Sequence, residues 1–233
     1  MEKIKNSNGL LVMLGLAIIG CMLPLSVVKW KSYDRTVSVK GLCEREVKAD
    51  KAIWPVSFKV VGNELGSLNA EIDRNTASIV EFLKAGGIPD NEITVALPKV
   101  SDKFAQEYGG NERTFRYVAS CTVTVCSSMV DEVLALMANQ SALLKRGIVL
   151  TIDWDSTPSF NFEGLNEVKP GMIEEATKNA REVAEKFAKD SDSRLGKIKD
   201  ASQGTFSIEN RDSNTPYIKK VRIVTYVTYY LSN

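Results

Sequence analysis

The sequence contains no histidine among its 233 residues. This absence excludes Ser-His-Asp and Cys-His catalysis, histidine-ligated metal centres and a histidine pH switch, because each of these needs an imidazole. An excess of charge of one sign is also missing: 30 Lys and Arg residues balance 29 Asp and Glu residues, which leaves a formal net charge of +1. This balance predicts no nucleic-acid partner.

Recognisable metal, nucleotide and catalytic motifs are missing as well. The candidates are Gly86-Gly87, Gly109-Gly110, Asp153 with Asp155, Asp190 with Asp192, and Ser127-Ser128. The glycine pairs lack the spacing of a phosphate-binding loop, and the aspartate pairs lack the spacing of a calcium loop. The serine pair has no base near it in sequence. We therefore predict that the chain is not an enzyme and has no catalytic, cofactor-binding or metal-binding residues.

The first strong feature that is present is an apolar run without charge over residues 9–28. About twenty apolar residues span a bilayer core of roughly 30 Å as a helix. We predict a signal anchor over residues 1–33, with the lipid bilayer as its partner and an exported domain over residues 34–233. Two alternatives remain, a cleaved signal peptide and a lipoprotein with its lipid on Cys21. All three place the domain outside the cytoplasm.

Periodicity after residue 35 predicts alternating groups of strands and helices. Predicted helices lie at Leu65–Ala85, 128–147 and Pro170–Leu195. Predicted strands lie at 37–43, 54–60, Ile93–Leu97, 117–126, Ile148–Trp154, Lys197–Ala201, Phe206–Ile208 and 221–229, with a hairpin partner within Thr157–Asn166. Strand pairs between single helices are typical of an α+β fold. We expect two-layer sandwiches of mainly antiparallel sheet with three helices, in two interleaved lobes, after one N-terminal transmembrane helix.

Local signals set several expected boundaries. Gly86-Gly87 ends the first helix, and Ser128 with Asp131 forms a capping box for the second. Pro55 predicts that its strand is an edge or carries a bulge, because proline cannot donate a ladder hydrogen bond. The polar stretch 98–113 is interpreted as a loop or hairpin tip.

The third helix is the most regular element of the chain. Its buried stripe combines small and large residues: Ile173, Ala176, Ala180, Val183, Ala184, Phe187 and Ala188. Small residues on that stripe let the helix lie close to a sheet. Acid-before-base pairs four residues apart support an exposed opposite face. Pro170 suits the first turn, and Gly196 suits the left-handed residue just past the helix end.

Three cysteines fall on predicted strands. Cys43 and Cys121 lie on apolar faces, and Cys126 lies on the opposite, threonine-bearing face. A Cys43–Cys121 disulfide requires neighbouring strands with Cα atoms within about 7 Å. The alternative is a set of buried, inert thiols.

Tyrosines crowd the last strand at Tyr226, Tyr229 and Tyr230. We interpret them as packing or subunit-contact residues. We expect this strand to be a terminal edge strand, at which another chain can pair.

Three stretches resemble one known family. Val37-x-Val39-x-Gly41 followed by residues 44–52 is similar to the opening V-x-G-x-x-E-x-x-x-x-P-D-x-A of SIMPL-domain proteins, with Ala49 where many members carry proline. Residues 176–198 resemble the family's small-residue helix and its Leu-Gly-Lys-Ile exit. Gly87-Ile88 followed by Ile93-Thr94 matches the turn after the first helix. The similarity spans residues 36–232.

The resemblance implies a bacterial cell-envelope protein that forms homo-oligomers, with a link to oxidative-stress tolerance and no catalytic residues. Together with the apolar N-terminus, it predicts a single-pass protein of the inner (cytoplasmic) membrane whose domain faces the periplasm. The leading functional hypothesis is a non-enzymatic, self-assembling envelope protein. The alternative is a thiol-based redox module that uses Cys43, Cys121 or Cys126.

Overall fold

The computed structural model describes residues 12–20, 22, 35–105, 114–152 and 156–232. Residues 12–20 and residue 22 are helical. The remainder of the predicted anchor, 1–33, lies outside the described residues. Within the described part of the chain, no helix is both long enough and apolar enough to cross a membrane.

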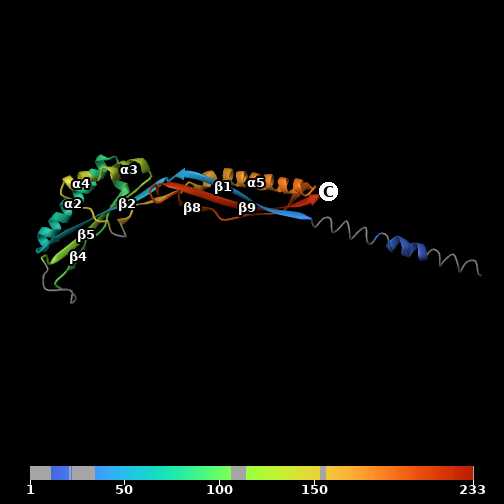
Figure 1. Cartoon of the computed structure of the whole chain (residues 1–233). Helices are drawn as coiled ribbons and strands as arrows, with labels where there is room; N and C mark the ends of the chain where they lie inside the picture. The colour runs from blue at the N-terminus through green and yellow to red at the C-terminus, as the bar shows by residue number, and fades with distance from the viewer. Residues whose placement is uncertain (1–11, 21, 23–34, 106–113, 153–155, 233) are drawn as a thin grey trace, which may run out of the picture. The chain divides into compact units, whose positions relative to one another are not determined.

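From residue 36 the chain forms an α+β fold with antiparallel sheets, as predicted. The strands are β1 (Thr36–Lys48), β2 (Lys51–Gly62), β3 (Ile93–Val95), β4 (Lys99–Asp102), β5 (Tyr117–Ser127), β6 (Ser159–Asn161), β7 (Arg194–Gln203), β8 (Ser207–Asn210) and β9 (Ile218–Ser232). The helices are α2 (Leu65–Ala85), the short 3-10 helix η1 (Asp90–Glu92), α3 (Val130–Ala138), α4 (Ser141–Lys145) and α5 (Leu165–Asp190). Most of them are labelled in Figure 1.

These elements form two compact units, each built from separate stretches of chain. The smaller unit, named the single-helix unit after α5, its one described helix beyond residue 35, comprises Met1–Arg45, Val168–Ser207 and Arg222–Asn233. The larger unit comprises Glu46–Glu167 and Ile208–Val221.

The larger unit contains a five-stranded sheet in the order β3-β5-β2-β6, with β4 also paired to β5. Strands β2 and β5 pair along their length, from Ala52 opposite Ser127 to Gly62 opposite Tyr117. Alternate residues of both strands are buried, which confirms the predicted faces. Helix α2 contacts both strands and α3 contacts β2. Each large apolar side chain buried there contributes about 1.5–3 kcal/mol.

Helix α2 has the predicted bounds and the predicted end. Gly87 has a φ of 91°, and its N–H donates to the Lys84 carbonyl at 2.9 Å. The Ile88 N–H reaches back to the Leu83 carbonyl at 3.2 Å. These two bonds satisfy carbonyls that a helix end otherwise leaves open, and glycine takes the left-handed position without strain.

The second predicted helix differs from the structure. It is broken into α3 and α4, because the N–H groups of Gln140 and Ala142 donate to carbonyls only three residues earlier, those of Met137 and Asn139. The predicted capping box is wrong: α3 begins after Met129 without a side-chain cap, and the Ser127 hydroxyl accepts the Met129 N–H at 3.0 Å. Ser127 is buried, so this bond satisfies its hydroxyl inside the core.

Two further predictions, one of a strand and one of a loop, differ from the structure. Residues 148–152 form no strand: Leu150 makes an isolated bridge to Phe58, and the Thr151 N–H donates to the Ser57 carbonyl at 2.8 Å. Within the stretch expected to be a loop, β4 forms; residues 106–113 lie outside the described chain. The ladder with β6 covers only residues 51–53 of β2, so Pro55 lies beyond it.

The four-stranded sheet has the order β1-β9-β7, with β8 also paired to β9. In the single-helix unit, α5 runs along it (Figure 1). The buried stripe of α5 consists of Met172, Ala176, Ala180, Ala184 and Ala188. A Cβ built on Gly41 of β1 would lie 1.8 Å from the Ala176 carbonyl oxygen. Helix and strand backbones therefore touch, as the small residues predicted.

The predicted ends of this helix are wrong. It begins earlier, so Pro170 lies inside it, and it ends at Asp190. The left-handed residue is Asp192, with a φ of 49°, followed by a Ser193 N–H bond to the Ala188 carbonyl at 2.9 Å. Gly196 lies instead in β7, where a Cβ would meet the Tyr230 carbonyl oxygen at 2.9 Å.

Candidate functional site

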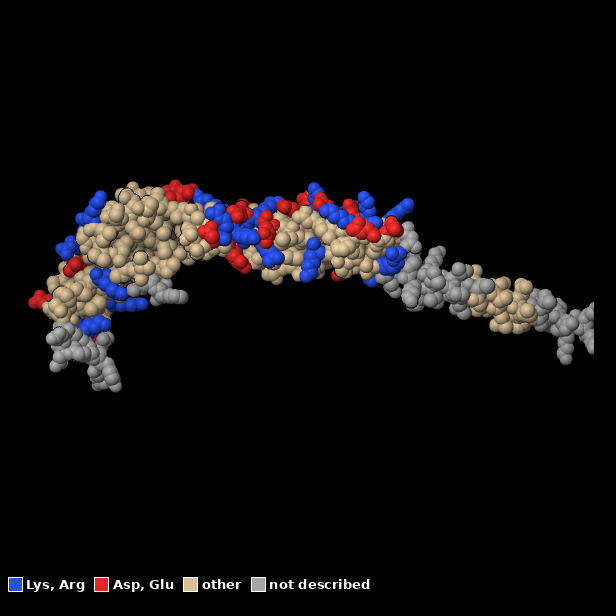
Figure 2. Space-filling model, viewed as in Figure 1, with Lys and Arg blue, Asp and Glu red and all other residues tan. Residues whose placement is uncertain are grey.

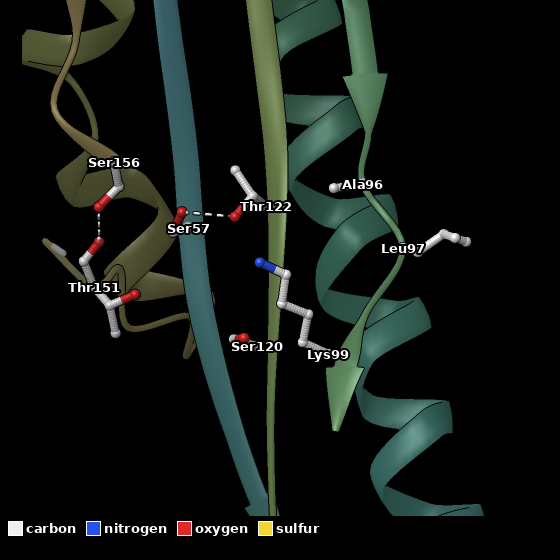
Figure 3. Close-up of a pocket in the computed structure, with 8 residues that line it drawn as sticks. All are labelled: Ser57, Ala96, Leu97, Lys99, Ser120, Thr122, Thr151 and Ser156. Atoms are coloured by element: carbon white, nitrogen blue, oxygen red, sulfur yellow. Dashed lines mark hydrogen bonds between the residues drawn. The ribbon is translucent and has the colours of Figure 1, made fainter. Parts of the chain in front are cut away.

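The most distinctive site in the larger unit is a cleft lined by hydroxyl groups, hereafter the hydroxyl cleft. It has a volume of about 160 Å³. Its lining residues, drawn in Figure 3, are Ser57, Ala96, Leu97, Lys99, Ser120, Thr122, Thr151 and Ser156. Ser57, Ser120 and Thr122 alternate with the buried core residues of β2 and β5. They therefore lie on the sheet face opposite the helices.

The floor of the cleft is a cross-strand pair. Ser57 of β2 stands opposite Thr122 of β5, and their hydroxyl oxygens are 2.8 Å apart. One wall is held by two bonds: the Thr151 N–H donates to the Ser57 carbonyl at 2.8 Å, and the Ser156 hydroxyl donates to the Thr151 carbonyl at 3.2 Å. The Thr151 hydroxyl is buried and has no hydrogen-bond partner among the described residues. A buried hydroxyl without a partner costs stability, and this one belongs to a residue that lines the cleft.

The only charged residue that lines the cleft within the described chain is Lys99. It lies on β4 opposite Ser120 of β5, and its side chain extends across the sheet towards Thr122 (Figure 3). Lys99 makes no ion pair with any described residue, and no described carboxylate lines the cleft. Among its described lining residues, the cleft thus combines one positive charge with several hydroxyls.

The three described cysteines are free thiols in different surroundings. Cys43 and Cys121 are buried, and Cys126 is exposed on β5. Burial raises the pKa of Cys43, and the neighbouring Glu175 carboxylate raises it further. The Cys121 thiol donates to the Ala96 carbonyl at 3.5 Å. The Cys43–Cys121 disulfide does not form, and of the three described cysteines only Cys126 is open to a solution oxidant.

Strand β9 lies between β1 and β7, so the expectation of a terminal edge strand is wrong. Alternation alone does not distinguish a central from an edge strand of the same sheet. Tyr229 is buried, whereas Tyr226 is exposed, with the Lys40 ammonium 5.2 Å from the centre of its ring.

The remaining sequence candidates are either outside the described residues or at helix ends. Asp153, Asp155, Gly109 and Gly110 lie outside the described residues. Asp190 and Asp192 are at the end of α5. The described part of the chain holds no group of three or more His, Cys, Asp or Glu side chains that could bind a metal.

The sequence-based prediction missed the hydroxyl cleft. The available signal was the run of serine and threonine on one face of β5, which was noted only as the threonine-bearing face. The sequence carries no sign that Lys99 and Thr151 come to that face, because they lie on separate segments.

Asp50 lies in the family-like stretch 44–52, where the sequence predicts only a turn, and its carboxylate has a structural role there. Its carboxylate accepts the Glu163 N–H at 2.8 Å and the Gly164 N–H at 2.7 Å. These amides directly precede α5, where a negative charge also favours the helix dipole. Asp50 therefore ties the β1–β2 turn to the start of α5.

With both units described, a comparison with family models identifies the fold. Residues 37–223 match the model of SIMPL, a protein of unknown function (DUF541). The chain belongs to the SIMPL family. The match begins in β1 and ends in β9, so it includes the Asp50 turn, the small-residue helix α5 and the hydroxyl cleft of this SIMPL protein. No curated protein matches the chain.

Proposed function

We propose that this SIMPL protein is a non-enzymatic component of the bacterial cell envelope that self-assembles into a homo-oligomer. In this proposal residues 1–33 anchor it in the inner membrane as a single pass, with the domain in the periplasm. A contribution to oxidative-stress tolerance belongs to the same proposal, on the strength of the family resemblance. No nucleic acid and no cofactor take part.

The observation that carries self-assembly is a group of three exposed apolar side chains within residues 144–152. Leu144 is 58%, Val149 64% and Ile152 93% exposed. In Figure 2 the part of the larger unit that holds α3 and α4 presents a broad area without charged side chains. Exposed apolar area of this kind favours a protein contact.

Strand edges offer a second means of association. Strands β1 and β7 stand at the two ends of the order β1-β9-β7, so each has an outer edge that pairs with no other described strand. Unpaired backbone groups on such an edge can pair with another chain. Lys197 and Lys199 lie on β7, and their like charges would repel if two β7 edges paired with each other. This repulsion favours contacts between two different surfaces of the protein.

The test is the mass of the full-length chain in mild detergent, measured by light scattering. Wild type should be oligomeric, and Val149→Asp with Ile152→Asp should shift the mass towards the monomer. Both side chains are exposed, so the fold should tolerate the change. The control pair Val149→Ile and Ile152→Val keeps the surface apolar and should keep the oligomer. A wild-type monomer would refute the proposal.

The exposure of Cys126 supports the second candidate function, a thiol-based redox module. The thiolate is the reactive form of cysteine, and burial disfavours it at Cys43. Cys126→Ser should then abolish reaction with a small oxidant, while Cys43→Ser and Cys121→Ser should leave it unchanged. An unreactive Cys126 in the native protein would remove this candidate.

A further inference from the structure

We propose that the hydroxyl cleft binds a phosphate group, either free or as the phosphate of a monoester. The cleft lies within one compact unit, and the proposal is independent of self-assembly. Its basis is the convergence of Lys99, the orphan Thr151 hydroxyl and the serine and threonine hydroxyls of the sheet floor.

Charge selects an anion. Lys99 supplies the positive charge, and neither a described ion pair nor a described carboxylate in the lining neutralises it. An anion that enters the cleft therefore meets an ammonium group that no described carboxylate of the lining neutralises. Charge-assisted hydrogen bonds of this kind are roughly twice as strong as neutral ones.

The directions of the donors select a tetrahedral anion. Lys99 approaches from β4, Ser120 and Thr122 rise from the sheet floor, and Thr151 lies on the opposite wall (Figure 3). Donors on three sides match the several oxygens of a phosphate better than the two oxygens of a carboxylate. The volume of about 160 Å³ also leaves room for the small organic part of a monoester.

The Thr151 hydroxyl gives the independent sign of a ligand. It is buried against the cleft and has no partner among the described residues. Its backbone is fixed by the bond to Ser57, so the hydroxyl stays in place to donate to a bound oxygen. A phosphate oxygen would satisfy a group that the folded chain leaves without a hydrogen bond.

The experiment is calorimetric titration of the full-length chain, in mild detergent at fixed ionic strength, with inorganic phosphate, glycerol 3-phosphate and acetate. Wild type should bind phosphate or glycerol 3-phosphate saturably and more tightly than acetate. The tighter of the two phosphates identifies whether the free ion or a monoester is the natural source. Lys99→Gln should weaken binding roughly tenfold to a hundredfold, the loss of one charge-assisted hydrogen bond.

Two further variants separate binding from folding. Thr151→Val keeps the shape of the side chain and should weaken binding several-fold, and Lys99→Arg should stay within a few-fold of wild type. Lys145→Gln, an exposed lysine at the end of α4, is the matched control and should bind as wild type does. Absence of saturable phosphate binding, acetate binding of equal strength, or equal loss in Lys99→Gln and Lys145→Gln would overturn the proposal.

Discussion

Gly41→Ala tests the close approach of α5 to β1. The added Cβ would lie 1.8 Å from the Ala176 carbonyl oxygen and 2.7 Å from the Ala180 nitrogen. A carbon and an oxygen in contact normally stand about 3.3 Å apart, so the helix would have to move by roughly 1.5 Å. Both obstructing atoms belong to the backbone, and no rotamer change can relieve the clash.

The magnitude follows from two opposing effects. Replacing glycine by alanine in a permitted conformation stabilises a protein by about 0.4–1 kcal/mol through the unfolded chain. Overpacking costs about 1–3 kcal/mol, and a backbone clash belongs at the upper end. Moving α5 outward would also open space beside Ala180 and Ala184, which are completely buried. We expect a net loss of about 2 kcal/mol.

The assay is thermal unfolding of the full-length chain in mild detergent. A loss of about 2 kcal/mol lowers the melting temperature by roughly 4–8 °C for a domain of this size. Gly66→Ala is the control, because Gly66 lies in α2 with no atom within 4 Å of the added Cβ. That variant should melt at or above the wild-type temperature. A Gly41→Ala protein as stable as wild type would refute the close approach.

Three further predictions concern stability. Asp50→Ala should lower the free energy of unfolding in urea by about 1.5–3 kcal/mol, because the amides of residues 163 and 164 lose a charged acceptor. Asp50→Glu keeps the charge on a longer side chain and should lose less stability. Equal losses in the two variants would contradict a role for the charge. Thr151→Val should raise the free energy of unfolding by about 1 kcal/mol without ligand, because it removes a buried hydroxyl that lacks a described partner; a loss would show that the hydroxyl is satisfied. The hydrogen bond from Thr215 and the adjacent Arg211 guanidinium lower the pKa of Asp212 in the folded state. The ionised Asp212 therefore stabilises the fold fully above its unfolded pKa of 3.8, and this contribution disappears as pH falls through the lower folded pKa. Asp212→Asn should weaken the fall of the melting temperature between pH 5 and pH 2. An unchanged dependence of the melting temperature on pH would exclude Asp212 as a source of that fall.

Elements with a local signal could be predicted from the sequence. The bounds of α2 and its end at Gly86-Gly87 are confirmed, because helix periodicity and a left-handed glycine act within a few residues. The faces of β2 and β5 are confirmed for the same reason. The small-residue stripe of α5 also correctly indicated close packing on the sheet.

Features that depend on distant segments could not be predicted. The central place of β9 results from its pairing with β1 and β7, which periodicity does not encode. Gly196 was assigned to the end of α5 by its residue type, whereas Asp192 takes the left-handed position. Lys99 reaches the hydroxyl cleft through the register of β4 on β5, which only the folded sheet defines.

Self-assembly is the central claim, and the mass of the full-length chain in detergent across a series of protein concentrations tests it most directly. The account predicts a defined multiple of the mass of one chain, 25.7 kDa, that persists on dilution and is lost in the double variant with aspartate at positions 149 and 152. A single 25.7 kDa species at every concentration, in both proteins, would contradict it.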